Sequence, residues 1–430
     1  MPNSSKQHSA KLTLIKGGKI SGKEFAKRPF PEKLTTLREL PAVKRMELIL
    51  ADPEAHKLTR AFQPQELFWM VNEIGLTDAL ELLELSSPEQ FTFFLDTELW
   101  EKWSFSQVKA LEWLGYLAEA GEARVLDQLS HIDFELLILI FMKEVTVGGG
   151  IGELATDDER LADWDHSFDN IYFISFKSPQ HYRLIATLLD IVFRNDHPLY
   201  LALMEGIRNE PQSELEELCY QLRSGRLADL GFPEFEEALS IYARVDPAAF
   251  VPGEEKKLVP FGGEESLPVP LLTGDSLLQR ALARAGSEEL FLELNYLINS
   301  ALVAEETALA DNEVMQAVFQ RVYGCLNIAL EYLTGGNEEK AAGVLTEEYL
   351  KRLFQLGYSV IIGLKRTAEK LNSDNYAINK ALLGLKAKRP MFYRGLDPDG
   401  IDGYREFREM EDVRKVEEFL RTLEDLCGQV

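Results

Sequence analysis

The chain has 430 residues, of which 46% are hydrophobic and 27% charged, so it is long enough for two or three domains that each bury a core. Aspartate and glutamate number 71 against 46 lysines and arginines, which gives a formal net charge of −25. A charge of this sign and size repels nucleic acids and anionic lipids. We therefore expect no nucleic acid on the body of the protein.

Basic residues concentrate at the start of the chain. Residues 1–45 contain eleven Lys or Arg and three acids. Such a segment either contacts nucleic acid, a membrane or a partner, or lies on its own acidic body. We favour the second interpretation, because the basic residues are spread out and Phe25 and Phe30 are the only aromatic side chains that could stack on bases. We assign residues 1–38 to a basic, flexible arm.

The three cysteines, Cys219, Cys325 and Cys427, are far apart and form no Cys-x-x-Cys pair. Each lies in an apolar, helix-like setting, which predicts buried thiols in a reducing compartment. The longest apolar run, residues 136–142, has seven residues, whereas a membrane-spanning helix needs about twenty. The first residues lack the apolar segment of a secretory signal. These features predict a cytoplasmic protein that does not insert into a membrane.

Short helical patterns with marked ends fill residues 39–245. Pro64 opens an apolar stripe that Gly75 closes, which is the arrangement expected at the two ends of a helix. Residues 87–90 have the spacing of a capping box before the next helix. Two stretches that contain Gly75 and Gly121 repeat at an offset of 46 residues, a period found in helical solenoids. We therefore predict a solenoid-like helical repeat domain over residues 39–245.

One stretch interrupts the helical pattern. Residues 144–147 and 171–176 have the composition of strands. Three glycines at 148–150 and an acidic stretch lie between them. We predict a small β-hairpin insertion at 144–178.

Residues 246–275 are rich in proline and glycine, which prevents a long helix and predicts a linker. Apolar stripes at helical spacing follow, and Gly357 within one of them suits a close crossing of two helices. We predict a C-terminal helical bundle over residues 276–430. Together with the N-terminal domain, this bundle makes the predicted fold class all-α.

Two glycine-containing motifs resemble ligand-binding loops but depart from them. Residues 150–155 match the G-x-G-x-x-[G/A] dinucleotide fingerprint, yet the sequence lacks the following amphipathic helix and second parallel strand, so we interpret them as a hairpin loop. Residues 397–403 resemble the start of an EF-hand loop, but Ile401, Asp402 and Arg408 occupy positions that require other residues. We interpret that segment as a polar turn before the last helix.

The densest group of acidic residues lies inside the β insertion. Oxygen ligands at this density bind Mg²⁺ or Ca²⁺, and a histidine beside carboxylates is a further ligand or base. The spacing matches no established loop, and a run of acids is more often a solvated surface. The candidate metal-binding residues are Asp157, Asp158, Asp163, Asp165, His166 and Asp169.

A short joint between two helices, residues 223–233, contains two arginines, an acid, two glycines and an aromatic residue. In one interpretation the joint is a structural corner, in which Gly231 ends a helix and an arginine pairs with Asp229 or a nearby glutamate. In the other interpretation Arg223, Arg226 and Asp229 line a recognition site for a carboxylate or phosphate. We favour the corner and keep these three as candidate ligand-binding residues.

Three segments, namely residues 223–242, Arg389-Pro390 and residues 404–407, resemble an uncharacterised bacterial family described only as a domain of unknown function. That resemblance covers most of the chain and implies no activity. Separately, residues 40–143 resemble the N-terminal helical superhelix of MgtE-type magnesium transporters, with short leucine-rich helices that begin at prolines such as Pro64. In those transporters the domain is acidic, cytoplasmic and regulatory, and it responds to Mg²⁺. This chain lacks their transmembrane part and paired nucleotide-binding modules, so we carry over the fold and not the metal.

The sequence contains no nucleophile elbow, Walker A loop, kinase loop or set of zinc ligands. We therefore predict a non-enzymatic interaction, scaffold or regulatory protein whose helical surfaces bind another protein. The alternative is a divalent-metal-responsive regulator or a metal-dependent enzyme that uses the acidic insertion.

Overall fold

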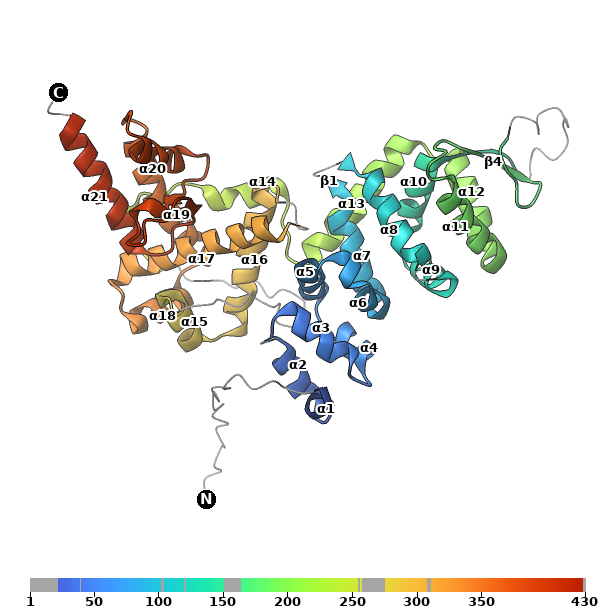
Figure 1. Cartoon of the computed structure of the whole chain (residues 1–430), viewed down its shortest axis with the longest axis horizontal. Coiled ribbons are helices and arrows are strands. Elements are labelled where there is room, and N and C mark those ends of the chain that lie inside the picture. Colours follow the sequence, from blue (N-terminus) through green and yellow to red (C-terminus); the bar gives the residue numbers. More distant parts are fainter. Residues whose placement is uncertain are drawn as a thin grey trace, which may run out of the picture.

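The computed structural model describes residues 22–38, 40–101, 104–119, 121–150, 164–253, 256, 275–307 and 311–427. These residues form 21 α-helices and three antiparallel sheets of two strands each. About 70% of the described residues are helical, which confirms the predicted all-α class. Figure 1 shows two lobes, one made by helices α1–α13 and the other by helices α14–α21. Across the described part of the chain, no helix has the length and apolar composition that crossing a membrane requires.

The N-terminal lobe is an array of short helices, many of which pack against helices close to them in the chain (Figure 1). Its helices are α1 (Gly22–Phe25), α2 (Phe30–Arg38), α3 (Ala42–Leu50), α4 (Ala55–Arg60), α5 (Pro64–Ile74), α6 (Leu80–Leu85), α7 (Pro88–Glu98), α8 (Gln107–Glu119), α9 (Glu122–Leu129), α10 (Phe134–Glu144), α11 (Tyr182–Asn195), α12 (His197–Asn209) and α13 (Gln212–Asp229). Its paired strands are β1 (Trp100–Glu101) with β2 (Ser104–Phe105), and β3 (Val145–Gly149) with β4 (Tyr172–Phe176).

The C-terminal lobe is a helical bundle with one short sheet. Its helices are α14 (Phe235–Leu239), α15 (Leu277–Ala285), α16 (Glu288–Ala304), α17 (Asn312–Thr334), α18 (Glu338–Glu347), α19 (Leu350–Ala368), α20 (Tyr376–Lys386) and α21 (Met410–Cys427). Its strands are β5 (Phe392–Tyr393) and β6 (Tyr404–Arg405). The sheet lies between α20 and α21 in the chain, in the part of the lobe coloured deep orange and red in Figure 1.

The packed structure begins earlier in the chain than the sequence predicts. Residues 22–38, assigned above to a flexible arm, form α1 and α2, and the side chains of Phe25 and Leu37 are fully buried. Lys33 on α2 is buried as well, with Nζ 2.8 Å from Oδ2 of Asp52. The prediction of flexibility is wrong for these residues, because two apolar anchors and a buried ion pair fasten them to the lobe. Residues 1–21 lie outside the described residues.

Gly75 and Gly121 occupy equivalent places in the two stretches that the sequence predicts to repeat. Both have positive φ angles, 102° and 98°, in a region that favours glycine. A helix follows each of them, α6 and α9. The likeness ends there, because a 3-10 helix at Leu76–Asp78 precedes α6, whereas α9 starts directly at Glu122. The helical repeat therefore stays a prediction.

The insertion at 144–178 contains a β-hairpin, as the sequence predicts. β3 and β4 pair antiparallel, with Gly149 opposite Tyr172. Gly148 lets the Trp164 ring lie against the strand, since a Cβ atom at this position would come within 2.3 Å of that ring. Residues 151–163, which connect the two strands, lie outside the described residues.

Residues that precede the predicted linker already pack in the C-terminal lobe. Helix α14 contacts α16, and a 3-10 helix at Ser240–Tyr242 contacts α19. The chain therefore crosses from one lobe to the other between α13 and α14. Of the predicted linker, residues 246–253 are described and include a 3-10 helix at Pro247–Ala249, and residues 257–274 lie outside the described part.

Helices α17 and α19 cross at very short range. A Cβ atom on Gly357 of α19 would lie 1.9 Å from the carbonyl oxygen of Cys325 on α17. The close crossing predicted at Gly357 is therefore confirmed. Gly324 of α17 lies against the backbone of Phe407 in the same way, where a Cβ atom would come within 1.8 Å of the carbonyl oxygen. These two contacts draw α17, α19 and the segment before α21 together.

Helix α5 joins the N-terminal lobe to the bundle. Gln65 Nε2 donates to Asn299 Oδ1 of α16 at 2.8 Å, and both side chains are buried. Trp69 packs edge-on against Phe319 of α17, with ring centres 5.5 Å apart. The two lobes thus share a contact that has both a polar and an aromatic part.

Candidate functional site

Arg226 of the predicted corner fastens three helices of the N-terminal lobe to one another. It donates from Nε and Nη2 to the two carboxylate oxygens of Asp96 on α7, both at 2.8 Å, and from Nη1 to Asp133, which precedes α10. The side chain of Asp96 is 3% exposed. Burial raises the pKa of the Asp96 carboxyl, and the charge of Arg226 opposes that shift. The predicted pairing with Asp229 or a nearby glutamate is wrong, because the partners come from distant helices.

Arg223 and Asp229 have different surroundings. Arg223 Nε donates to the backbone oxygen of Asp96, and its guanidinium carbon lies 5.8 Å from the centre of the Trp100 ring. Asp229 is exposed at the end of α13, and no side chain in the described part of the chain bonds to it. The structure thus brings Arg223 and Arg226 together at Asp96 and leaves Asp229 apart. Recognition of an external carboxylate or phosphate at this corner stays a prediction.

The described members of the predicted metal site shape the hairpin instead of facing one another. Asp165 Oδ2 accepts from the backbone N–H of Phe176 at 2.9 Å. Asp169 Oδ1 accepts from the backbone N–H of Tyr172, also at 2.9 Å. The ring of His166 packs on the Phe168 ring, with centres 4.2 Å apart. Among the described residues no three candidate ligands gather into a site for a metal ion. Asp157, Asp158 and Asp163 lie outside the described residues, as does all of the 150–155 fingerprint except Gly150.

The EF-hand-like segment folds as a turn, as the sequence predicts, and its first aspartate holds an arginine. Arg405 Nη2 donates to Asp397 Oδ2 at 3.0 Å, and Arg405 Nη1 donates to Asp412 Oδ2 at 2.7 Å. The guanidinium also lies over the Phe392 ring, 4.0 Å from its centre. Arg405 of β6 therefore ties this turn to α21, and Asp397 also accepts from Lys415 of that helix.

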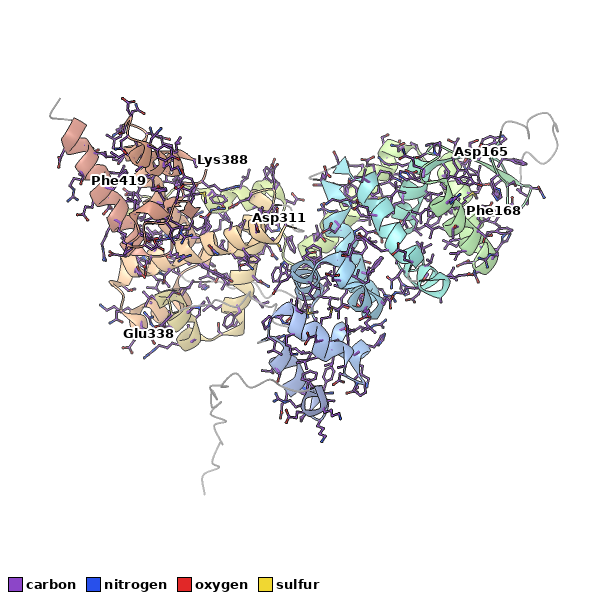
Figure 2. All side chains as sticks on the ribbon, in the orientation of Figure 1. Asp165, Phe168, Asp311, Glu338, Lys388 and Phe419 are labelled. Atoms are coloured by element: carbon purple, nitrogen blue, oxygen red, sulfur yellow. The ribbon has the colours of Figure 1, made fainter. Side chains whose placement is uncertain are left out.

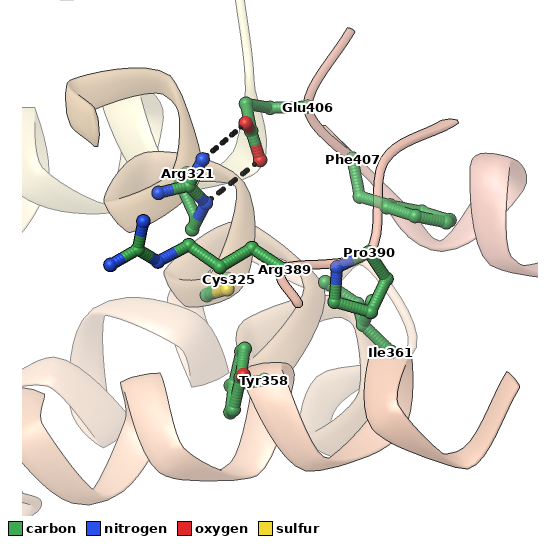
Figure 3. Close-up of a pocket in the computed structure, with 8 residues that line it drawn as sticks. All are labelled: Arg321, Cys325, Tyr358, Ile361, Arg389, Pro390, Glu406 and Phe407. Atoms are coloured by element: carbon green, nitrogen blue, oxygen red, sulfur yellow. Dashed lines mark hydrogen bonds and ion pairs between the residues drawn. The ribbon is translucent and has the colours of Figure 1, made fainter. Parts of the chain in front are cut away.

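A buried cluster of arginine and glutamate side chains lies where α17 faces the segment before α21 (Figure 3). Arg321 Nη2 donates to Glu406 Oε1 at 2.6 Å and Arg321 Nε donates to Glu406 Oε2 at 3.1 Å. Arg321 Nη1 also donates to Glu305, which follows α16. The side chains of Arg321, Glu305 and Glu406 are 11%, 4% and 4% exposed. Burial raises the pKa of Glu406, and Arg321 opposes that shift.

The space beside this cluster is too small for a substrate. It encloses about 10 Å³, which is room for about one water molecule. Cys325 and Tyr358 line it together with the arginines (Figure 3). Burial raises the pKa of the Cys325 thiol, which disfavours the thiolate that acts as a nucleophile. The cluster therefore joins the end of α16, helix α17 and the segment before α21.

A solvent-open groove of about 450 Å³ runs along α21. Its floor is apolar, and its rim carries a lysine, a glutamate and a threonine. The lining residues are Ile378 of α20, Leu396 of the turn, and Lys415, Glu418, Phe419, Thr422 and Leu423 of α21. Phe419, marked on α21 in Figure 2, is half-buried, and Ile378 faces the groove from α20. The groove is thus formed by the last two helices of the bundle and the turn between them.

Comparison with known proteins gives the family. The sequence model of DUF6178, a family of unknown function, matches residues 22–428, from the first described residue almost to the end of the chain. This chain belongs to DUF6178. No curated protein and no solved structure matches it. The resemblance to a family of unknown function is confirmed, and the resemblance of residues 40–143 to MgtE-type transporters stays a prediction.

In this DUF6178 chain, each of the three segments that carried the family resemblance contributes one residue to the buried cluster. The hydroxyl of Tyr242, at the end of the first segment, donates to Glu305. Arg389, in the second, has Nη1 3.2 Å from Oε2 of the same carboxylate. Glu406, in the third, pairs with Arg321. One residue from each of the three segments therefore takes part in the buried cluster of this chain.

Two features of this DUF6178 chain were missed in the sequence. Arg321 interrupts the apolar stripe of its helix, one residue before the buried Val322, and a charge at such a position signals a buried ion pair. The α20–α21 groove left no such signal, because its lining is assembled from residues 378, 396 and 415–423, which are brought together by folding.

Proposed function

We propose that this DUF6178 protein is a non-enzymatic interaction protein, and that its α20–α21 groove receives the apolar side chains of a helical segment from a partner protein. The observation that carries the proposal is the contrast between the two hollows of the C-terminal lobe. The groove measures about 450 Å³ and opens to solvent, whereas the polar cluster encloses about 10 Å³.

The lining of the groove suits the apolar face of a helix. Ile378, Leu396, Phe419 and Leu423 form an apolar floor, as in grooves that take side chains spaced by three and four residues on a partner helix. The rim residue Glu418 is exposed, so it is available to a polar group at the edge of the partner.

The alternative drawn from the sequence was a metal-responsive regulator or a metal-dependent enzyme that uses the acidic insertion. No observation on the described residues favours it, because Asp165 and Asp169 bond to backbone N–H groups of the hairpin and no trio of candidate ligands occurs there. We therefore keep the interaction protein as the proposed function.

Two substitutions on the same helix test the proposal. Ile378→Glu places a charge in the groove, and Leu383→Glu places the same charge on α20 outside the groove, where Leu383 is 58% exposed. Wild-type and variant proteins are used to capture partners from the native lysate, and bound proteins are quantified by mass spectrometry. Circular dichroism confirms that both variants fold.

We expect a defined partner that wild type and Leu383→Glu retain equally and that Ile378→Glu loses. A set of bound proteins that Ile378→Glu leaves unchanged would contradict the groove as the binding site. Equal loss with Leu383→Glu would also contradict it, because the outer face of α20 would then be the surface that binds.

A further inference from the structure

A second basic region lies deep inside this acidic chain. Residues 365–394 contain eight Lys or Arg and two acids, a net charge of +6, so the rest of the chain carries −31. The region spans the end of α19, the whole of α20 and the start of the β5–β6 sheet. A local reversal of charge on a strongly acidic protein marks a place where the surface potential changes sign.

Two lysines of this region bring its two halves together. Lys365 Nζ donates to the backbone oxygen of Ala387 at 2.7 Å, and Lys386 Nζ donates to the backbone oxygen of Leu371 at 2.6 Å. The residues around the end of α19 therefore lie beside those that follow α20. Both lysines bond to carbonyl oxygens at helix ends, so their charges are not neutralised by carboxylates.

Three further basic side chains lie close in the sequence to these two lysines and are exposed to solvent. Arg366, Lys370 and Lys388 are exposed, and in the described part of the chain none of them contacts a carboxylate. Arg366 lies in the last turn of α19, where the helix dipole favours a cation, and Lys370 and Lys388 lie two residues beyond the ends of α19 and α20. We call Lys365, Arg366, Lys370, Lys386 and Lys388 the basic edge.

We propose that the basic edge binds a short acidic segment of a partner protein through Arg366, Lys370 and Lys388. These three basic side chains can each pair with a carboxylate of one short acidic segment. A nucleic acid carries one phosphate per nucleotide, and its further phosphates would meet a chain whose remaining residues carry a net charge of −31. The charge distribution therefore favours the protein segment.

The acidic insertion of the same molecule is not the occupant. Figure 2 shows Lys388 in the C-terminal lobe and Asp165, at the base of the insertion, at the opposite end of the molecule. The basic edge also shares no residue with the α20–α21 groove. The test of the basic edge is therefore independent of the test of the α20–α21 groove.

The experiment measures binding of a fluorescently labelled peptide of Glu, Asp and Leu to the full chain by anisotropy, at low and high salt. The test variant carries Arg366→Glu, Lys370→Glu and Lys388→Glu. The control carries Lys27→Glu, Arg183→Glu and Lys340→Glu, three exposed residues elsewhere, so that both variants have the same net charge. Circular dichroism checks that both fold.

We expect the peptide to bind wild type and control alike, to bind the test variant about tenfold more weakly, and to dissociate as salt rises. Absence of binding to wild type, or equal weakening in the control, would overturn the proposal. So would tighter binding of a single-stranded oligonucleotide or of anionic lipid vesicles at the same edge. If the wild-type protein self-associates at low salt and the test variant does not, the proposal of a separate partner protein would be overturned. A second copy of this chain would then be the occupant of the basic edge.

Discussion

Arg321 and Glu406 lie 85 residues apart in the sequence, yet Arg321 Nη2 donates to Glu406 Oε1 at 2.6 Å in a setting where the two side chains are 11% and 4% exposed. Arg321 Nη1 also donates to the carboxylate of Glu305. Arg321 therefore pairs with two buried carboxylates, and Arg389 adds a second positive charge beside Glu305.

Arg321→Met leaves Glu305 and Glu406 buried without their main counter-charge. We expect it to lower the free energy of unfolding by about 3–5 kcal/mol, the usual cost of removing one partner from a buried ion pair. Urea unfolding followed by circular dichroism measures the loss. Arg183→Met, at an exposed arginine of α11, is the matched control and is expected to change stability by less than about 0.5 kcal/mol. Equal effects of the two substitutions would show that the cluster is not needed for the fold.

Two glycines of α19 are expected to respond in opposite directions to the same substitution. Gly357→Ala forces a Cβ atom against the carbonyl oxygen of Cys325, so we expect a loss of about 3 kcal/mol. Gly363 has no atom within 4 Å of a new Cβ, so Gly363→Ala is expected to add about 0.5–1 kcal/mol through helix propensity. Thermal unfolding of both variants measures the two shifts. A neutral Gly357→Ala would mean that α17 and α19 separate without cost.

Substitutions of Asp96 and Asp229 test which carboxylate pairs with the corner arginines. Asp96→Ala removes the carboxylate that receives two bonds from Arg226, and we expect a loss of about 3 kcal/mol. Asp229→Ala removes an exposed side chain, and the expected change is within about 0.5 kcal/mol. Chemical denaturation of the two variants separates the roles. A larger effect of Asp229→Ala would restore the pairing that the sequence suggested.

The thiol of Cys219 makes stability fall in alkaline solution. Burial raises its pKa to about 12 in the folded protein, whereas an unfolded thiol ionises near about 8.5. The folded state therefore binds more protons than the unfolded state above about pH 8.5, so the stabilising contribution is complete below that pH and is lost as pH rises toward 12. The slope for this group is about 1.4 kcal/mol per pH unit.

Cys219→Ala removes that contribution. We expect the difference in unfolding free energy between wild type and this variant to shrink steadily between about pH 9 and 11, as measured by urea unfolding at each pH. A difference that stays constant with pH would show that the Cys219 thiol ionises as freely in the folded protein as in the unfolded chain.

Local patterns predicted much of the fold. The hairpin at 144–178 and the crossing at Gly357 were both read from composition and helical spacing, and the structure has both. A position at which only glycine fits can be recognised from the neighbouring sequence alone. Residues 22–38 were misread because their basic charge concealed two apolar anchors, Phe25 and Leu37.

The partners of the charged residues could not be predicted in the same way. Arg226 is 130 residues from Asp96 and 93 residues from Asp133, so no local window contains both members of either pair. The groove is likewise assembled from separate segments. The basic edge could have been predicted from the sequence, since a count of the charges over residues 365–394 reveals it.

The most direct test of the proposed function is contact between a partner and the groove inside the cell. A photoreactive benzoylphenylalanine replaces Thr422 on the exposed rim, and the matched control replaces Glu411, which is 53% exposed on the same helix outside the groove. After irradiation, adducts are identified by mass spectrometry. We expect one defined partner protein linked at position 422 and none at position 411. No adduct at 422, or equal adducts at both positions, would contradict the proposal that the α20–α21 groove binds a partner.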